Sequence, residues 1–427
     1  MQILLSLSIA LLAGLLLSRL AKLLQLPAVT AYLVAGILIG PYCLGAFKVS
    51  GLGFTSMQDV KSYSIVCDVA LGFIAFSIGN EFRLSQLKKI GKQATIVGIF
   101  QAVVTTLLVD AALILLHLAM PTKLPLPAAI TLGAIASATA PAATLMVVKQ
   151  YKAKGPLTDI LLPVVALDDA VGLVLFAISF GVAKALLNGA VDVISIIVEP
   201  LLEVVLSIGL GGVMGFLFHW CERFFHSRSK RLSVSVAFVL MTIGLSMINF
   251  TIGGRVHVAF SSLLTCMMLG TVFCNVCDFS EELMDRVDRW TAPIFILFFV
   301  LSGAELELSV FTDFMIVLIG VVYILARSAG KYTGAFVSAK FAKCDDNIVK
   351  YLGVTLLPQA GVALGMALKS AELGLPIIAN ITLFAVLIYE LIGPMLTKIA
   401  LLKAGDINPE GKTSARHEHA KSKGMQI

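Results

Sequence analysis

The sequence predicts an all-α polytopic membrane protein with about thirteen transmembrane helices. Its 427 residues are 58% hydrophobic and 14% charged, with a mean hydropathy of +0.96. An ordinary soluble domain carries roughly 25% charged residues, so a soluble protein of this composition would lack a polar surface. The apolar residues are spread over the whole chain in segments of membrane-spanning length, and the basic residues gather in alternate loops. These observations indicate one transmembrane domain, near 1–403, and a short tail, 404–427.

The predicted spans are the apolar segments of about 20 residues, the length that crosses a bilayer as a helix. The apolar run at the N-terminus shows no small-residue cleavage site, so we expect it to be a retained first span rather than a signal peptide. The thirteen segments lie near 2–22, 27–46, 62–80, 94–119, 126–149, 157–184, 193–218, 232–252, 256–275, 290–308, 311–337, 348–371 and 377–400.

The basic residues predict the orientation of these spans. With the N-terminus outside, the cytoplasmic loops and tail hold 24 lysines and arginines and the outer side holds 6. Cytoplasmic loops of membrane proteins carry such an excess, and one missed span would scramble it. We therefore expect a multi-pass protein of the cell (inner) membrane with a cytoplasmic C-terminus.

Several functional classes are excluded by composition and motif. The net charge of +6 is distributed over short loops, so it does not indicate a nucleic-acid partner. Cys274 and Cys277 form a single CxxC, which supplies too few ligands for a structural metal site. The spans contain no nucleophile–base or metal constellation, so we expect neither an enzyme nor a cofactor.

Two adjacent acids at mid-membrane are the sharpest feature of the sequence. Asp168 and Asp169 lie about eleven residues into the sixth span, roughly 17 Å along a helix, in the middle of a hydrocarbon core about 30 Å thick. A charge at that depth costs at least about 3 kcal/mol and usually marks a functional site. Adjacent residues point about 100° apart, so the two acids can serve different partners. The alternative is a pair of acids fixed by helix-packing hydrogen bonds.

Three further charged residues lie within spans. Arg327 is near the centre of the eleventh span and needs a counter-charge or a wet cavity, which the acids of the sixth span can supply. Lys331, one turn nearer the cytoplasm, pairs with an acid or snorkels to the inner surface. Glu390, at mid-depth in the thirteenth span, is a second partner for these bases or a structural acid held by hydrogen bonds. The single acids Asp68 and Asp110 lie away from the midplane and are expected to be interfacial or packing residues.

Two spans are predicted to be broken. Pro141 removes a backbone donor and clashes with the preceding turn, beside Thr139 and Ala140 in the fifth span. The twelfth span carries a similar set of residues, Pro358, Gln359 and Gly361. Broken membrane helices persist where protein or a cavity satisfies the freed backbone groups, and a matching pair in two halves points to a transporter binding site. Two ordinary proline kinks are the alternative.

The motifs around these residues resemble the monovalent cation/proton antiporter superfamily, of the sodium/hydrogen exchanger type with paired aspartates. The resemblance covers about residues 5–400. The paired aspartates after a broken TAPA-type helix make it specific. The motifs on which the resemblance rests lie near 27–41, 73–82, 137–144, 166–176, 326–335 and 357–365.

The resemblance implies a fold of two inverted repeats with crossed broken helices and a division into moving and static parts. Core helices near 94–184 and 311–400 would move against a dimerising scaffold near 2–80 and 232–308, joined by a linker near 193–218.

The resemblance also implies roles for the site residues. Asp169 would bind a monovalent cation and a proton competitively, with oxygen atoms from Thr139 and Ala140. Asp168 would pair with the basic residue of span eleven that matches Arg327. The sequence departs from many relatives at Ala140, where they carry aspartate, and from some paired-aspartate members at Arg327, where they carry lysine.

The sequence therefore predicts a secondary active antiporter, and the resemblance implies that it acts in pH homeostasis as a homodimer. It would exchange a monovalent cation, Na+ before K+ or Li+, for protons by alternating access across the lipid bilayer. Oxygen-only ligation suits such a hard cation. The alternative is an organic-anion symporter or facilitator on a related fold, with Arg327 binding the anion. A channel is not favoured because no continuous polar pore stripe or filter loop is evident.

Overall fold

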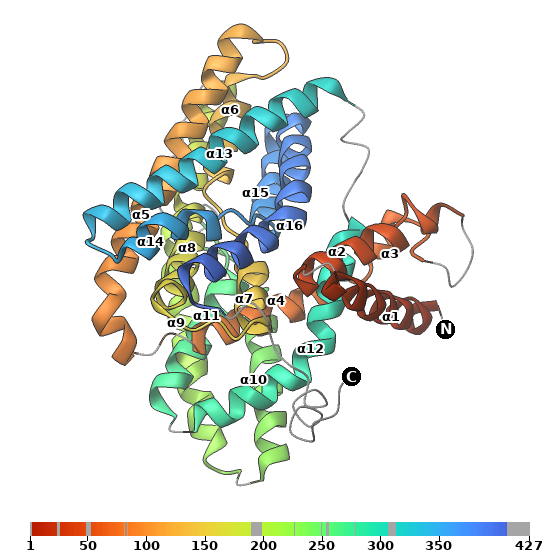
Figure 1. Cartoon of the computed structure of the whole chain (residues 1–427), viewed down its shortest axis with the longest axis vertical. Helices are drawn as coiled ribbons and strands as arrows, with labels where there is room; N and C mark the ends of the chain where they lie inside the picture. The colour runs from red at the N-terminus through yellow and green to blue at the C-terminus, as the bar shows by residue number, and fades with distance from the viewer. Residues whose placement is uncertain are drawn as a thin grey trace.

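A computed structural model describes residues 2–23, 26–47, 53–80, 82, 84–188, 199–225, 227–248, 250–252, 256–277, 279–305 and 313–407. Most of the tail, 408–427, lies outside the described residues, as does the side chain of Asp169. The described chain is a bundle of helices (Figure 1).

The helices follow one another in three groups along the chain. The first group is α1 (Gln2–Leu23), α2 (Ala28–Ile39), the 3₁₀ turn η1 (Leu44–Phe47), α3 (Met57–Lys61), α4 (Ser64–Asn80) and α5 (Leu84–Ala119). The second is α6 (Leu126–Ile135), α7 (Pro141–Gln150), α8 (Pro156–Asn188), α9 (Glu199–Glu222) and α10 (Arg228–Ser246). The third is α11 (Ser262–Val276), α12 (Ser280–Glu305), α13 (Phe314–Phe341), α14 (Asp346–Thr355), α15 (Gly361–Lys369), η4 (Ser370–Leu373) and α16 (Pro376–Ala404).

Within the described residues, 9 helices are long and apolar enough to cross a bilayer. The shorter apolar helices α4 and α11, and the interrupted pairs α6–α7 and α14–α15, lie where the other spans are predicted. The predicted fold class, a multi-pass α-helical membrane protein, is therefore confirmed. The count of thirteen spans stays a prediction.

Two consecutive predicted spans, near 232–252 and 256–275, extend too far toward each other. Helix α10 ends at Ser246 and α11 begins only at Ser262. Between them, β1 (Phe250–Ile252) and β2 (Val256–Val258) pair antiparallel, with Phe250 opposite Val258. Aromatic and β-branched residues on both sides of two glycines are typical of a hairpin, and mean hydropathy does not distinguish such residues from helical ones.

Both predicted helix breaks are present. Helix α6 ends at Ile135, and the chain is not helical again until Pro141 occupies the first turn of α7, where its missing N–H is not needed. Likewise α14 ends at Thr355, and α15 begins at Gly361 after a non-helical connection that contains Pro358.

The two non-helical connections cross each other. The amide of Ala140 donates to the Pro358 carbonyl at 2.8 Å, and the side-chain amide of Gln359 donates to the Ile135 carbonyl at 3.0 Å. Each break therefore satisfies backbone groups that the other leaves free, which is the condition for a broken helix inside a membrane.

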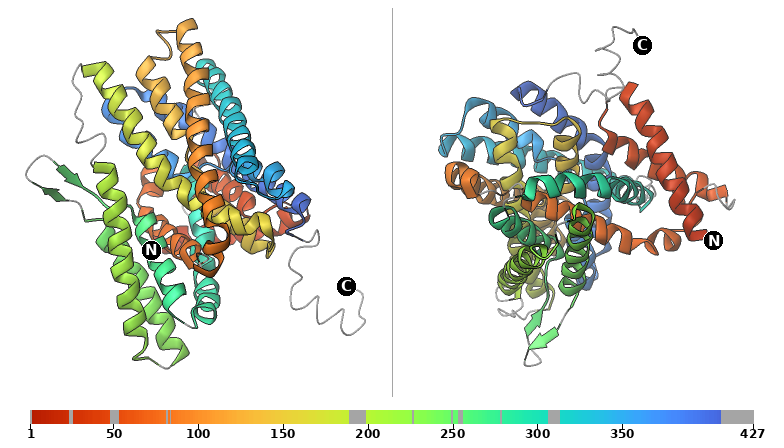
Figure 2. Two further views of the ribbon diagram at one scale, coloured as in Figure 1. Left: turned by 90° about the vertical axis from the view of Figure 1, so that its left-hand side faces the viewer. Right: turned by 90° about the horizontal axis from the view of Figure 1, so that it is seen from below.

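The helices around the crossing form two inverted repeats. The order long helix, broken helix, long helix occurs as α5 to α8 and again as α13 to α16. Helices α5 and α13 lie side by side and run antiparallel (Figure 2), because Gly334 packs on Gln101 while Gly330 packs on Thr105. A Cβ at Gly334 would lie 2.9 Å from the Gln101 Cα, so glycine permits this close approach.

The remaining long helices flank the repeats and share a buried aromatic cluster. Phe73 and Phe76 of α4 pack in it with Phe218 of α9 and Phe273 of α11. Residues of α7 and α8, and Ala140 of the first break, also belong to this cluster, whereas two other clusters lie within the repeats. The crossing therefore lies at the boundary between the repeats and the flanking helices.

Candidate functional site

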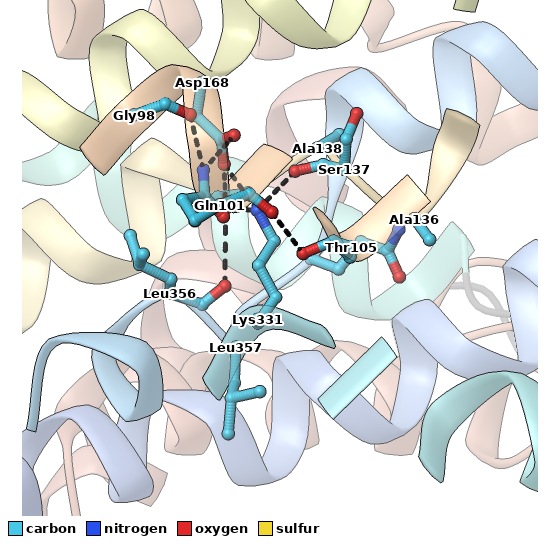
Figure 3. Close-up of polar contacts among 12 residues, drawn as sticks. Gly98, Gln101, Thr105, Ala136, Ser137, Ala138, Asp168, Lys331, Leu356 and Leu357 are labelled. Carbon is cyan, nitrogen blue, oxygen red and sulfur yellow. Dashed lines mark hydrogen bonds and ion pairs between the residues drawn. The ribbon is translucent and has the colours of Figure 1, made fainter. Parts of the chain in front are cut away.

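The carboxylate of Asp168 is the centre of the polar contacts at the crossing. Its side chain is fully buried in α8 and lies 2.6 Å from the ammonium of Lys331 on α13. Gln101 of α5 donates to its other oxygen at 2.5 Å, and the Thr139 hydroxyl donates to the same oxygen as Lys331. Figure 3 shows Gln101 and Lys331 pointing toward Asp168 from different helices. Three helices and the first break thus converge on one acid.

Lys331 ties this acid to the backbone of the first break. Its ammonium donates to the carbonyl of Ser137 and, at 2.9 Å, to the hydroxyl of Thr139, in addition to Asp168. Its side chain is 0% exposed, so it does not snorkel to the inner surface as one of the two sequence-based readings has it. A buried ion pair is tolerated only when further hydrogen bonds satisfy its remaining groups, and these contacts do so.

Arg327 has a different partner from the one that the resemblance implies. Its guanidinium donates to three backbone carbonyls, of Ala136 at 2.9 Å, Ala138 at 2.7 Å and Leu357 at 2.6 Å. These are carbonyls that the breaks after α6 and α14 leave without helical partners. The implied Arg327–Asp168 pair is therefore wrong, and Lys331 forms the pair. The rigid fork of arginine donors suits several diverging carbonyls, whereas lysine, one turn further along, reaches the acid as a point charge.

The residues expected to hold the ion are only partly described. Asp169 follows Asp168 in α8, and its side chain lies outside the described residues. The Thr139 hydroxyl is fully engaged between Asp168, Lys331 and, at 3.3 Å, the Leu356 carbonyl. The carbonyl of Ala140 has only a contact of 3.5 Å from the Thr144 amide, at the limit of a hydrogen bond. It is therefore a backbone oxygen of the first break that is available to a ligand.

Glu390 is not paired with the bases of α13. It is 5% exposed, and the ion pairs found in the described part of the chain do not include it. Its Oε2 atom has no hydrogen-bond partner there. Of the two roles considered from the sequence, pairing with Arg327 or Lys331 is not found among these ion pairs. The other role, a structural acid held by hydrogen bonds, stays a prediction.

Sequence reasoning missed Gln101 and the tyrosines near the crossing. Gln101 is fully buried and is the only amide side chain that donates to Asp168 in the described structure. A lone amide at mid-depth of an apolar span was the available signal, because a polar residue there needs a partner. Tyr323 accepts from Gln359 at 3.0 Å, and the Tyr389 ring lies 4.5 Å from the Arg327 guanidinium carbon.

This arrangement defines a class of protein. Acids at mid-membrane, placed where two broken helices of inverted repeats cross, form the binding-site architecture of a secondary transporter. Half-helix ends surround the site, and their dipoles act on a bound ion. A family of sodium/hydrogen exchangers, described as transmembrane, matches residues 7–403. The chain therefore belongs to the sodium/hydrogen exchanger family, which is a family of transporters.

Two curated relatives show how far the similarity extends. The chain is 24% identical over 412 residues to the Na+/H+ antiporter NhaS4 of Synechocystis sp., covering 93% of this chain and 96% of that protein. It is also 24% identical over 289 residues to the ammonium/H+ antiporter subunit AmhT of Alkalihalophilus pseudofirmus, covering 67% of this chain and 66% of that protein.

The fold is similar to that of a solved transporter. The sodium proton antiporter MjNhaP1 from Methanocaldococcus jannaschii superposes with a TM-score of 0.66 over 95% of this chain and 99% of that chain, at 19% identity. A second structure of MjNhaP1 gives a TM-score of 0.70 at 18% identity. At these identities the likeness establishes the fold alone.

Proposed function

We propose that the protein is an antiporter that exchanges a monovalent cation, Na+ in the first place, for protons. The observation that carries this proposal is the buried Asp168–Lys331 pair at the crossing, with a second acid, Asp169, as the next residue of the same helix. Because Asp168 is occupied by Lys331, Gln101 and Thr139, the neighbouring acid is the one that is left for the transported ions.

The coupling follows from one site serving two ions. Asp169 binds either a proton or a dehydrated cation, with the Ala140 carbonyl as an oxygen ligand, and it does not bind both. The Thr139 hydroxyl, which the resemblance also implies as a ligand, instead holds Asp168 and Lys331 in place. Oxygen ligands suit a hard cation. The site crosses the membrane only when one of the two ions neutralises the acid, so the inward movement of one ion is tied to the outward movement of the other.

Alternating access requires two bodies that move against each other. The repeats, near 94–184 and 311–400, serve as the core, and the helices near 2–80 and 232–308 as the scaffold, connected near 193–218. A small set of polar contacts joins the two at the C-terminal end of α7. Lys149 of α7 lies 2.6 Å from Asp288 of α12 and 3.0 Å from the Ser77 hydroxyl of α4, and these contacts can break and reform during transport.

The scaffold would also hold two copies together, with the N-terminus outside the cell membrane. This homodimer rests on the family resemblance, and the orientation rests on the distribution of basic residues. Cross-linking of the purified protein in bilayers tests the first, and labelling of single cysteines in the loops of intact cells tests the second.

The test of the proposed function is proton movement in sealed proteoliposomes that contain a lumenal pH dye. A pH gradient is imposed, and Na+, K+, Li+ or ammonium is added with the membrane potential clamped or free. We expect cation-dependent collapse of the gradient, lost in Asp169→Asn and kept in Asp110→Asn, which makes the same change at a partly buried acid of α5. Full exchange by the Asp169→Asn variant, or no effect of any cation on the wild type, would refute the proposal.

The organic-anion alternative loses its main support at Arg327. Each of its three nitrogens donates to a backbone carbonyl of the two breaks, and the side chain is fully buried, so the guanidinium is not presented to an anion. The same proteoliposomes discriminate the two functions, because an anion carrier would leave the pH gradient unchanged when only the cation is varied.

A further inference from the structure

Glu390 is a buried acid that the mechanism described above does not use. It lies in the middle of α16, is 5% exposed, and has one carboxylate oxygen without a hydrogen-bond partner among the described residues. An ionised carboxylate buried without a donor or a counter-charge is costly. Such a group is expected where it can meet a mobile proton or cation.

The position of Glu390 is the boundary between the repeats and the flanking helices. The next residue, Leu391, accepts a hydrogen bond from the Thr30 hydroxyl of α2 at 3.4 Å. One turn further along α16, a Cβ at Gly393 would lie 3.0 Å from the Cα of Pro358, so that turn packs directly on the second break. Within three residues of Glu390, α16 therefore contacts both α2 and the second break.

A second acid lies at the same boundary. Glu305 is the last described residue of α12, and its neighbour Ala304 packs on Gly36 of α2, the helix whose Thr30 contacts α16. The charges of Glu390, of Asp68 in α4 and of Lys61 at the end of α3 lie near enough to act on that of Glu305. Lys61 is exposed, Asp68 and Glu305 are partly buried and Glu390 is buried. The acids thus form a series of decreasing exposure from the predicted outer surface toward the crossing.

We propose that Glu390 and Glu305 form a relay site that binds the transported monovalent cation between the outer surface and Asp169. The inference rests on the proposed antiport function and adds a second binding position to it. A cation that leaves water loses hydration, and carboxylate oxygens at intermediate depth replace it. Lys61 partly balances the charge of Glu305, which keeps the cation from binding too tightly to move on, as conduction through successive sites requires.

The test compares the two sides of the membrane. Because the series of acids lies on the predicted outer side, Glu390→Gln should raise the apparent KM for Na+ presented from outside, measured in right-side-out vesicles. Loss of one carboxylate that contacts a cation is expected to raise it about fivefold or more. The KM for Na+ presented from the cytoplasmic side, measured in inside-out vesicles, should stay at the wild-type value.

Two further variants make the result decisive. Glu305→Gln should raise the outer KM in the same direction, and it carries the test if Glu390→Gln fails to accumulate in the membrane. Asp110→Asn is the matched control, because Asp110 is a partly buried acid of α5 whose Oδ1 also has no hydrogen-bond partner among the described residues, so its KM should be unchanged on both sides.

An unchanged outer KM in both glutamine variants, or an equal change from both sides, would overturn the relay site. This outcome is distinct from failure of the proposed function. If the proposed function fails, the wild type shows no cation-dependent proton movement. If only the relay site fails, the wild type still exchanges ions and Asp169→Asn still abolishes that exchange.

Discussion

Replacing Lys331 by methionine should destabilise the fold far more than the same replacement at Lys149. Both lysines form an ion pair of 2.6 Å with an aspartate. The side chains of Lys331 and Asp168 are 0% exposed, whereas those of Lys149 and Asp288 are 24% and 33% exposed. Methionine keeps a similar length and removes the charge, so the two variants differ mainly in the burial of the acid that is left behind.

The magnitudes follow from that burial. Removing one partner of a buried pair typically costs about 3–5 kcal/mol, because the remaining charge is not compensated. Removing one partner of an exposed pair costs at most about 1 kcal/mol. With an unfolding entropy of about 2.1 cal/mol/K per residue, the 427 residues give about 0.9 kcal/mol per kelvin. Lys331→Met should therefore lower the Tm by about 3–6 °C, and Lys149→Met by about 1 °C or less.

The assay is thermal unfolding of the purified protein in detergent, with a double-mutant cycle. Adding Asp168→Asn to Lys331→Met removes the uncompensated charge, so the double variant should regain most of the lost Tm. Equal Tm values for Lys331→Met and the wild type would refute the reasoning. A double variant no more stable than Lys331→Met would also refute it, since the loss would then come from packing.

Two other predictions concern motion and the breaks. In a background without the seven native cysteines, cysteines at Lys149 and Asp288, joined by a short reducible thiol cross-linker, should stop exchange until a reductant is added. The same cross-link between Arg228 and Glu282, whose side chains lie 3.6 Å apart on two flanking helices, should leave exchange intact. Unimpaired exchange with the first cross-link closed would contradict movement of the repeats against α12. Arg327→Lys leaves at least one of three carbonyls without its donor and should cost about 1–3 kcal/mol, or about 1–3 °C in Tm. A wild-type Tm in this variant would show that water replaces the guanidinium.

Features governed by local rules were predictable from the sequence. Hydropathy and span length indicated a multi-pass helical protein, and Pro141 and Pro358 indicated both breaks. These inferences depend on one residue and its near neighbours, because proline removes a backbone donor in any fold. The same reasoning failed between 246 and 262, where an apolar hairpin has the hydropathy of a helix end.

Features governed by neighbours in space were not predictable in the same way. The depth of Asp168, Arg327 and Lys331 in the membrane could be counted along the chain, and all three lie near the crossing. Spacing along the chain did not predict that Lys331 rather than Arg327 pairs with Asp168, and it did not predict the contact from Gln101. Hydropathy gives the position of a residue along a span but not the direction in which its side chain points.

The sequence by itself thus determined the membrane class, the depth of the acids and the places where two helices break. The tertiary structure alone decided which groups meet at those places. The carbonyls freed by both breaks lie within reach of Arg327, and this leaves Lys331 for the acid. Glu390 remains without a partner at one oxygen among the described residues, although it lies in the middle of α16 beside the residue that contacts α2. Rotation and packing of whole helices set these contacts, and they depend on every helix of the bundle at once.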